Sequence, residues 1–285
     1  IDTGFKPDWL WTKARNQTRS HELHDTTRGD NKRLKSDANT AEESYSNYLA
    51  FTSTGATFGT NHNLGYHADG ATTGVSWAWK ANGGTTSTDT NGSQNSTVQV
   101  NSTAGFSIVK RTGTGSAGAT YGHGLGAVPE VIINKGLNTN EWYSYFKAIG
   151  GGTHWMNLDE TNAAIDDANM WHDTDATNTV FTVGNSGGSN GSGVEYIAYC
   201  FTPIQGYSKF GKYTGNGNAD GPFVYTGFKP AWLMIKETIS GGSWGMWDNK
   251  RTTTNPMTIR LLANTSGTDD TSNDNSVDFL SNGFK

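Results

Sequence analysis

The stretch Thr226-Gly-Phe-Lys-Pro-Ala-Trp-Leu-Met-Ile-Lys236 decides how this chain folds, because it occurs more than once. Thr3-Gly-Phe-Lys-Pro-Asp-Trp-Leu-Trp-Thr-Lys13 is the same phrase with three substitutions, and His123–Lys135 holds a degenerate copy. Gly-Phe-Lys-Pro predicts a turn, since Gly permits unusual backbone angles and Pro fixes φ. The apolar run that follows predicts a buried strand. Internal repetition therefore sets the architecture.

Further landmarks recur at a constant offset. Pro7 and Pro129 lie 122 residues apart (129 − 7), and Val75–Trp79 matches Ile197–Phe201 at the same offset (201 − 79). Two markers that lie at opposite ends of a unit and share one offset indicate a duplication. Three shorter matches extend it: Gly105–Gly115 with Gly206–Gly217, Asp25–Arg28 with Asp248–Arg251, and Phe51–Gly55 with Phe279–Gly283.

This register divides the chain into three copies. We expect copy 1 at residues 1–81, a polar linker at 82–96, copy 2 at 97–204 and copy 3 at 205–285. Only copy 2 has both an opening and a closing strand; copy 1 lacks the opening strand and copy 3 lacks the closing strand. Two explanations stay open: the chain is an excerpt of a longer polypeptide, or the open ends accept strands from neighbouring subunits.

Composition favours β-structure. Apolar residues make up 33% of the chain, 37 glycines stand against 6 prolines, and 10 Trp, 11 Tyr and 12 Phe supply the large side chains. Few large rings among many small polar residues suit thin sandwiches. We therefore predict an all-β fold of tandem β-sandwich (jelly-roll or lectin-like) repeats, two to three copies, the first and last incomplete. A single helical turn is expected at Asn39–Ala50, where Thr40 and Glu43 form a capping-box pattern.

Charge and cysteine usage narrow the functional classes. The formal net charge of −5 argues against nucleic acid as a partner, and the basic cluster Arg28–Lys35 is interpreted as a solvated loop. No segment has the apolar length of a membrane span, so no membrane insertion is expected. Cys200 is the only cysteine, and its apolar surroundings predict a small core residue.

Acidic residues and histidines are candidates for catalytic or metal sites. Paired carboxylates serve glycosidases, and Asp-rich loops can hold Ca²⁺. The histidine pairs have no ligand spacing typical of a metal site. We expect no enzyme activity, no catalytic residue and no metal site, with Ca²⁺ as the one alternative cofactor. The candidates are Asp166, Asp167, Asp173, Asp175, Asp269 and Asp270, and the pairs His21/His24, His62/His67 and His154/His172.

Surplus aromatic residues are the better ligand-binding candidates. An exposed Trp or Tyr face beside Asn and Asp is one way of gripping a sugar ring, and the favoured alternative is that these rings form the core. The six candidates for a glycan-type site are Trp142, Tyr143, Trp155, Trp171, Trp244 and Trp247.

Taken together, these phrases resemble a known family. The chain is similar to the repeat domain of large tail-fibre-like virion structural proteins of marine and freshwater tailed phages, typically cyanophages. The resemblance spans essentially the whole chain and is carried by the segments Thr3–Trp9, Thr103–Val109, His123–Gly126, Gly206–Phe210 and Tyr213–Pro230. No catalytic residues are established in that family, so none is carried over.

The resemblance implies a structural and adhesive part of a phage tail fibre or similar extracellular fibre, at the virion surface, that contributes to host attachment. Expected partners are copies of itself, other virion proteins and a host cell-surface glycan. One alternative is a subunit of a bacterial extracellular filament or pilus assembled by strand donation. A second alternative is a carbohydrate-binding module.

Overall fold

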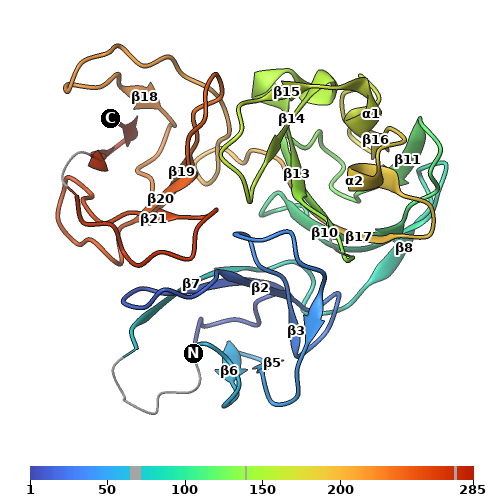
Figure 1. The fold of residues 1–285 in the computed structure, drawn as a ribbon, viewed down its shortest axis with the longest axis horizontal. Helices are drawn as coiled ribbons and strands as arrows, with labels where there is room; N and C mark the ends of the chain where they lie inside the picture. The colour runs from blue at the N-terminus through green and yellow to red at the C-terminus, as the bar shows by residue number, and fades with distance from the viewer. Residues whose placement is uncertain (65–71, 139, 273–274) are drawn as a thin grey trace.

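The computed structural model describes residues 1–64, 72–138, 140–272 and 275–285. The fold is all-β, as predicted, and consists of several separate sheets (Figure 1). The only helices of the described residues are single turns: α1 (Ala168–Trp171), α2 (Gly187–Asn190), η1 (Lys147–Ile149) and η2 (Gly151–Thr153). None of them has the length and apolar character needed to cross a membrane.

The repeated phrase forms the central strand of each copy, hereafter repeats 1, 2 and 3. These strands are β1 (Trp9–Ala14), β12 (Val131–Gly136) and β19 (Trp232–Ile235). Each pairs antiparallel with the next long strand of its own repeat: β2 (Glu22–Asp25), β13 (Trp142–Phe146) and β20 (Gly245–Asp248). The pairing is equivalent, because Trp9 faces Asp25 and Trp232 faces Asp248.

The closing strands confirm the 122-residue offset. β7 (Gly74–Trp79) pairs with β1 so that Trp79 faces Trp9, and β17 (Glu195–Phe201) pairs with β12 so that Phe201 faces Val131. In repeat 2, the opening strand β10 (Phe106–Thr112) lies on the other edge of β17.

Repeat 2 has the largest sheet. Its eight strands run in the order β15-β14-β13-β12-β17-β10-β9-β8. The strands not yet defined are β15 (Ile165–Asp166), β14 (His154–Asn157), β9 (Ser96–Asn101) and β8 (Ser87–Asp89), and a separate pair is β11 (Ala119–Gly122) with β16 (Val180–Val183).

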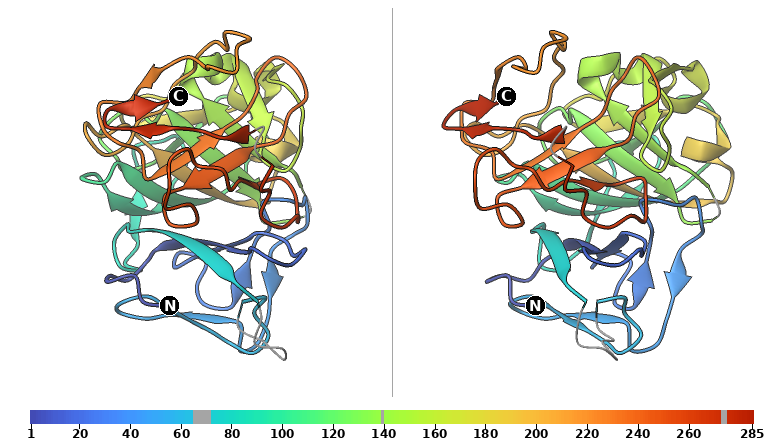
Figure 2. Two further views of the ribbon diagram at one scale, coloured as in Figure 1. Left: turned by 90° about the vertical axis from the view of Figure 1, so that its left-hand side faces the viewer. Right: turned by 60° about the vertical axis from the view of Figure 1, so that its left-hand side comes forward.

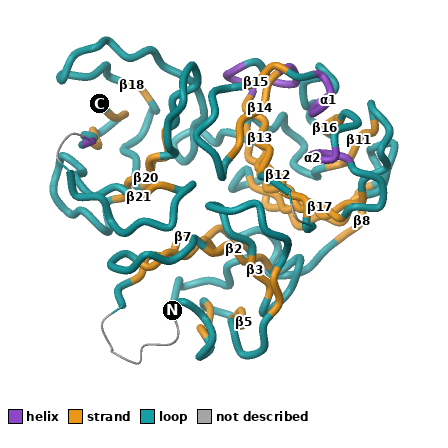
Figure 3. The backbone as a smooth tube through the Cα atoms, in the orientation of Figure 1, coloured by secondary structure: helices purple, strands orange, loops and turns teal. Residues whose placement is uncertain are grey.

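Short hairpins complete the outer repeats, and most of repeat 3 is loop (Figure 3). Phe51 pairs with Ala56 in one hairpin as Phe279 pairs with Phe284 in another, so this sequence match is confirmed. The remaining strands are β3 (Lys32–Arg33), β4 (Glu43–Ser44), β5 (Leu49–Phe51), β6 (Ala56–Phe58), β18 (Val224–Tyr225), β21 (Leu261–Leu262), β22 (Phe279–Leu280) and β23 (Gly283–Phe284).

Two local expectations were wrong. Residues 39–50 contain β4 and the start of β5 instead of a helical turn, because Glu43 is drawn onto the neighbouring strand by ion pairs with Arg33 and Lys35. The polar segment 82–96 is not a free linker: it contains β8, which adds an edge strand to the large sheet by pairing with β9.

The three repeats surround one shared core and are not strung along a line (Figures 1 and 2). One cluster of buried apolar side chains draws on all of them, for example Trp11 of repeat 1, Trp142 of repeat 2 and Trp244 of repeat 3. A straight rod would leave each repeat with its own separate core. The shared core therefore makes the chain a single body.

Hydrogen bonds close this body in a cycle. The residue just before or at the start of each repeat's second long strand donates a ring N–H to a backbone carbonyl of another repeat. The three bonds are His21 to Leu262 (3.0 Å), Trp142 to Lys35 (2.7 Å) and Trp244 to Asn157 (2.8 Å). A second cycle uses backbone N–H groups: Asp269 to Arg15 (2.7 Å), Glu42 to Leu137 (2.9 Å) and Ala164 to Thr238 (2.9 Å).

Candidate functional site

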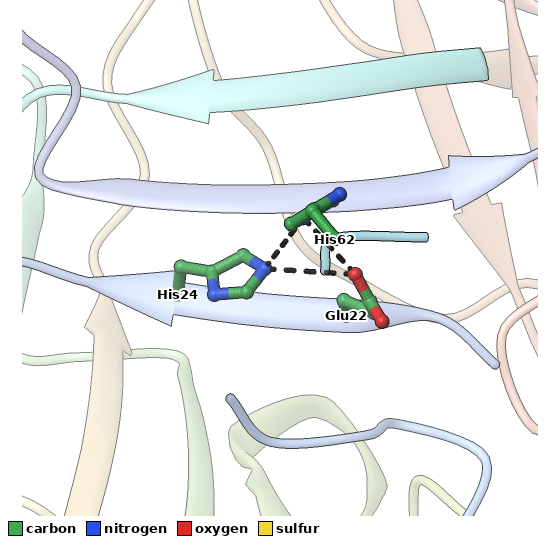
Figure 4. Close-up of side chains that lie close together, drawn as sticks. All are labelled: Glu22, His24 and His62. Carbon is green, nitrogen blue, oxygen red and sulfur yellow. Dashed lines mark hydrogen bonds and ion pairs between the residues drawn. The ribbon is translucent and has the colours of Figure 1, made fainter. Parts of the chain in front are cut away.

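Three buried polar side chains meet in repeat 1 (Figure 4). Glu22 and His24 lie two residues apart on β2, so both side chains point to the same face of the strand. His62 follows the β5–β6 hairpin. Its Nε2 lies 3.0 Å from Glu22 Oε2 and 3.3 Å from His24 Nε2, and His24 Nε2 lies 3.9 Å from Glu22 Oε2.

The other carboxylate oxygen of Glu22 is saturated with donors. Oε1 accepts hydrogen bonds from Arg33 Nη1 (2.7 Å), Asn63 Nδ2 (2.6 Å) and the Tyr48 hydroxyl. An ionised carboxylate has room for these donors and more. Glu22 is thus held by one cation and two neutral donors on one side, and faces the histidines on the other.

The backbone fixes the tautomers of both imidazoles. His24 Nδ1 lies 2.7 Å from the Lys32 carbonyl, so it carries the proton and donates. His62 Nδ1 accepts from the Leu64 N–H at 2.9 Å, so in the neutral ring the proton lies on Nε2. That proton is donated to His24 Nε2 at 3.3 Å. Glu22 Oε2 lies 3.0 Å from His62 Nε2 and is buried without a hydrogen-bond partner, so the two imidazoles form a neutral pair beside an unsatisfied carboxylate oxygen.

The spacing of the three atoms alone would suit a metal. Tetrahedral Zn²⁺ with ligand bonds of about 2.0–2.1 Å needs ligand atoms roughly 3.3 Å apart. A histidine that binds through Nε2 must, however, donate its Nδ1–H to an acceptor. His24 meets this condition and His62 does not, because its Nδ1 faces the Leu64 N–H donor. The donor set does not fit a metal centre.

Burial sets the charges of this cluster. Loss of water, the largest cause, lowers the pKa of His24 to about 3 and that of His62 to about 2. Burial also raises the pKa of Glu22, and the Tyr48 hydroxyl and Arg33 oppose that rise. Both imidazoles are accordingly neutral at pH 7.

The basic cluster Arg28–Lys35 is not the solvated loop expected. The Arg28 side chain is 1% exposed and pairs with Asp25 at 2.5 Å, and that of Arg33 is 9% exposed and pairs with Glu22 and Glu43. The Asp25–Arg28 pair has a counterpart in repeat 3, where Asp248 pairs with Arg251 at 2.6 Å. Arg33 links β3 to β2 and β4 through these ion pairs.

The histidine pairs considered as metal candidates from sequence do not include the contact that the structure shows. His24 meets His62, which lies 38 residues away, whereas His21 bonds to Trp11 and Leu262. His67 lies outside the described residues. A sequence signal for the His24–His62 contact does not exist, because it depends on how the β5–β6 hairpin folds back over β2.

The acidic candidates have local structural roles. Asp167 caps α1, Asp175 accepts from the Gly152 N–H, and Asp166 lies in β15. Asp173 occupies a turn with a φ of 47°. Asp269 pairs with Arg15 and Arg251, and Asp270 with Arg260. Among the described residues, the only group of three His, Cys, Asp or Glu side chains close enough to share an ion is Glu22, His24 and His62.

The aromatic candidates for glycan binding are mostly core residues. Trp142, Trp155, Trp171, Trp244 and Trp247 are buried, and Tyr143 is half-buried against Trp155. A buried ring cannot stack on a sugar from solvent. The five tryptophans therefore agree with the interpretation favoured from sequence, that these rings form the core, and not with an exposed glycan-type face.

Each repeat also buries one lysine at an equivalent position, which the repeated phrase contains. Lys13, Lys135 and Lys236 all donate to backbone carbonyls of a nearby loop, among them Ala14, Gly136 and Gly242. Burial lowers the pKa of Lys13 and Lys135 to about 8. The conserved spacing of this lysine within the chain thus reflects a structural contact made three times.

Repeat 3 presents an open strand edge. β1 and β12 are flanked by strands on both sides, whereas β19 pairs only with β20 within the described chain. Every residue of β1 and β12 is buried, and every residue of β19 is half-exposed. That copy 3 lacks its closing strand stays a prediction.

Comparison with known proteins supplies a family. A family profile described as a domain of unknown function, DUF7483, matches residues 1–285. The chain belongs to this DUF7483 family. No curated protein matches it, and no solved structure matches it. The matched residues include all three repeats and the shared core.

Proposed function

We propose that this domain is a structural and adhesive building block of an extracellular fibre at a virion surface, contributing to attachment to a host. The observation that carries the proposal is the closure of three repeats into one body by cyclic hydrogen bonds around an aromatic core. Such a body is suited to a load-bearing module. The resemblance of its repeat phrases to tail-fibre-like virion proteins gives the proposed location.

In the alternative proposal, subunits of an extracellular filament join by strand addition at a strand edge such as that of β19, which pairs only with β20 among the described residues. Both functions are structural, and they differ in what the module joins. The five tryptophans proposed to bind a sugar are buried, so they do not support carbohydrate binding. It is kept here only as the adhesive part of the first proposal.

Antibodies raised against the purified domain test the proposed location. On virions purified from a lysate of the source phage, immunogold electron microscopy should label fibres projecting from the particle. Filaments that label in the absence of virions would favour the alternative. Absence of the protein from both purified virions and extracellular filaments, measured by mass spectrometry, would overturn the proposal.

A further inference from the structure

One side-chain position is equivalent in all three repeats. The backbone N–H at the start of each repeat's second long strand, or just before it, donates to a side-chain oxygen from further along the same repeat. The three bonds are His21 to Asp37 Oδ1 (3.1 Å), Trp142 to Asp159 Oδ1 (3.0 Å) and Trp244 to Asn264 Oδ1 (3.0 Å). The three acceptors, two Asp and one Asn, therefore correspond to one another.

The residue that precedes this N–H contacts the same acceptor side chain. Ser20 hydrogen-bonds to Asp37, and Asn264 Nδ2 donates to Ser243 Oγ at 3.3 Å. Repeat 2 has Glu141 at this position instead of a serine. A hydroxyl donates and accepts, so it suits either an Asp or an Asn, whereas an ionised carboxylate only accepts. Repeat 2 thus places a second carboxyl group where the other repeats place a hydroxyl.

The second carboxyl oxygen of Asp159 shows the consequence. Asp159 is 8% exposed, and its Oδ2 is buried without a hydrogen-bond partner. Its counterparts Asp37 and Asn264 have no such unpaired buried atom. An unpaired buried oxygen is costly, but a proton on Oδ2 would make it a donor. Glu141 is the acceptor that the equivalent contacts in repeats 1 and 3 place beside it.

The charges around Asp159 favour a proton over a metal ion. Among the described residues, the titratable side chains that interact with Asp159 are Lys135 on β12, Glu141 before β13 and Tyr143 on β13. Lys135 is buried and supplies one positive charge, against two negative charges when both carboxyls are ionised. One proton makes this group neutral, whereas a divalent cation would leave an excess of positive charge in a buried place.

Burial decides which carboxyl group carries the proton. Loss of water, the largest cause, raises the pKa of Asp159 to about 7; the charge of Glu141 adds to this rise, and the Trp142 N–H and Lys135 oppose it. Glu141 is half-buried, and its Oε2 accepts from Asn157 Nδ2 at 2.9 Å, which suits an ionised carboxylate. The proton therefore belongs on Asp159.

We propose that Asp159 and Glu141 share one proton in the folded protein, and that this proton makes the junction of repeat 2 with its neighbours sensitive to pH. Trp142, whose N–H Asp159 accepts, bonds to repeat 1, and Asn157, which donates to Glu141, accepts from Trp244 of repeat 3. Loss of the proton leaves two carboxylates facing each other at this junction. The inference goes beyond the proposed function and does not depend on it.

The shared proton fixes the sign of the pH dependence. The pKa of Asp159 in the fold lies above the value of about 3.9 for an unfolded chain, so between about pH 4 and pH 7 the folded protein holds a proton that the unfolded chain has released. The contribution of this group to stability is full below about pH 4 and is lost as the pH rises to about 7.

The other repeats supply the two variants for the test. Asp159→Asn introduces the residue of repeat 3, whose Nδ2 is a permanent donor toward Glu141. Glu141→Ser introduces the residue of repeats 1 and 3, which donates to Asp159 and removes the second carboxyl group. Both variants are made in the whole 285-residue chain. The first keeps the hydrogen bond without a titrating proton, and the second keeps Asp159 and its burial.

Carbon-13 NMR of the Asp159 carboxyl group in the labelled wild type measures the proton directly. Asp159 should be protonated at pH 5 and titrate near neutral pH, and Glu141→Ser should lower its midpoint by about one pH unit. Chemical unfolding gives the second readout. The ratio of the unfolding equilibrium constant of the wild type to that of Asp159→Asn should increase at least tenfold, by about the linkage relation, from pH 5 to pH 7.

Three results would overturn the proposal. Asp159 that is ionised at pH 5 in the wild type would show that no proton is held. An Asp159 midpoint that Glu141→Ser leaves unchanged would show that burial alone acts and that the proton is not shared. A rise in Tm with Ca²⁺ that Glu141→Ser abolishes would show that a cation, and not a proton, lies between the two carboxyl groups.

Discussion

The indole N–H of Trp244 donates a 2.8 Å hydrogen bond to the backbone carbonyl of Asn157, and so joins repeat 3 to repeat 2. Trp142 makes the equivalent bond to repeat 1, and His21 completes the cycle. Two of these residues are Trp and the third is His, and all three share a position. The position, and not the residue type, is what the repeat preserves.

Trp244→Phe should destabilise the protein by about 1–3 kcal/mol, because it leaves the buried Asn157 carbonyl without its donor while keeping an aromatic ring. Urea unfolding measures the loss. Trp171→Phe is the matched control, since its buried indole N–H has no partner in the described structure. An equal loss in both variants would mean that ring volume alone matters and that the inter-repeat bond contributes nothing.

Lys135→Met should destabilise the protein by about 1–3 kcal/mol, because the carbonyls of Gly136 and Asn138 lose a charged donor. Lys110→Met serves as the control. Its ion pair with Glu195 is exposed and should matter by no more than about 0.5 kcal/mol. A stability of Lys135→Met equal to that of the control, measured by chemical unfolding, would contradict the structural role of the buried lysines.

The buried histidines predict a specific pH dependence. The folded-state pKa of His62 is lowered to about 2, so below about pH 6.5 the unfolded chain binds a proton that the folded chain does not. Its contribution to stability is fully present above pH 6.5 and falls by about 1.4 kcal/mol per pH unit below it. Carboxyls with raised pKa, such as Glu22 and Asp159, titrate in the opposite sense.

A comparison of the wild type with His62→Gln isolates the contribution of His62 to the pH dependence of stability. Gln is polar and cannot be protonated in this range, so the stability difference between the two proteins should shrink as the pH falls from 6.5 to 4.5. Unfolding curves at several pH values measure it. A difference that stays constant over this range would show that His62 is not kept neutral in the fold.

Zn²⁺ should not stabilise the protein through Glu22, His24 and His62, because His62 Nδ1 accepts from the Leu64 N–H. Thermal unfolding with EDTA and with excess Zn²⁺ should give the same Tm. A Zn²⁺-dependent rise in Tm that disappears in Glu22→Gln would contradict the hydrogen-bonded network and identify a metal centre.

The sequence predicted the parts of the fold that depend on local pattern. The repeated phrase and the 122-residue offset placed β1, β12 and both closing strands, because turn residues and apolar alternation act within a few residues. The Asn39–Ala50 helix failed because Glu43 gains more from Arg33 on β3 than a capping box provides.

The arrangement of the three repeats in space could not be predicted from local sequence pattern. The three ring N–H bonds of the cycle join residues 87, 107 and 241 positions apart. The His24–His62 contact and the burial of Arg28 have the same origin. The burial of the aromatic candidates was the favoured prediction, whereas local pattern could not show that Trp142 and Trp244 share one core with repeat 1.

Hydrogen exchange of single amides in the free protein tests the open edge most directly. The account predicts that the Arg15 and Leu137 amides, which bond to closing strands, are strongly protected, and that the Thr238 amide exchanges at close to the rate of an unstructured chain. The three positions are equivalent, so each controls for the others. Protection of Thr238 equal to that of Leu137 in the dilute protein would contradict the account.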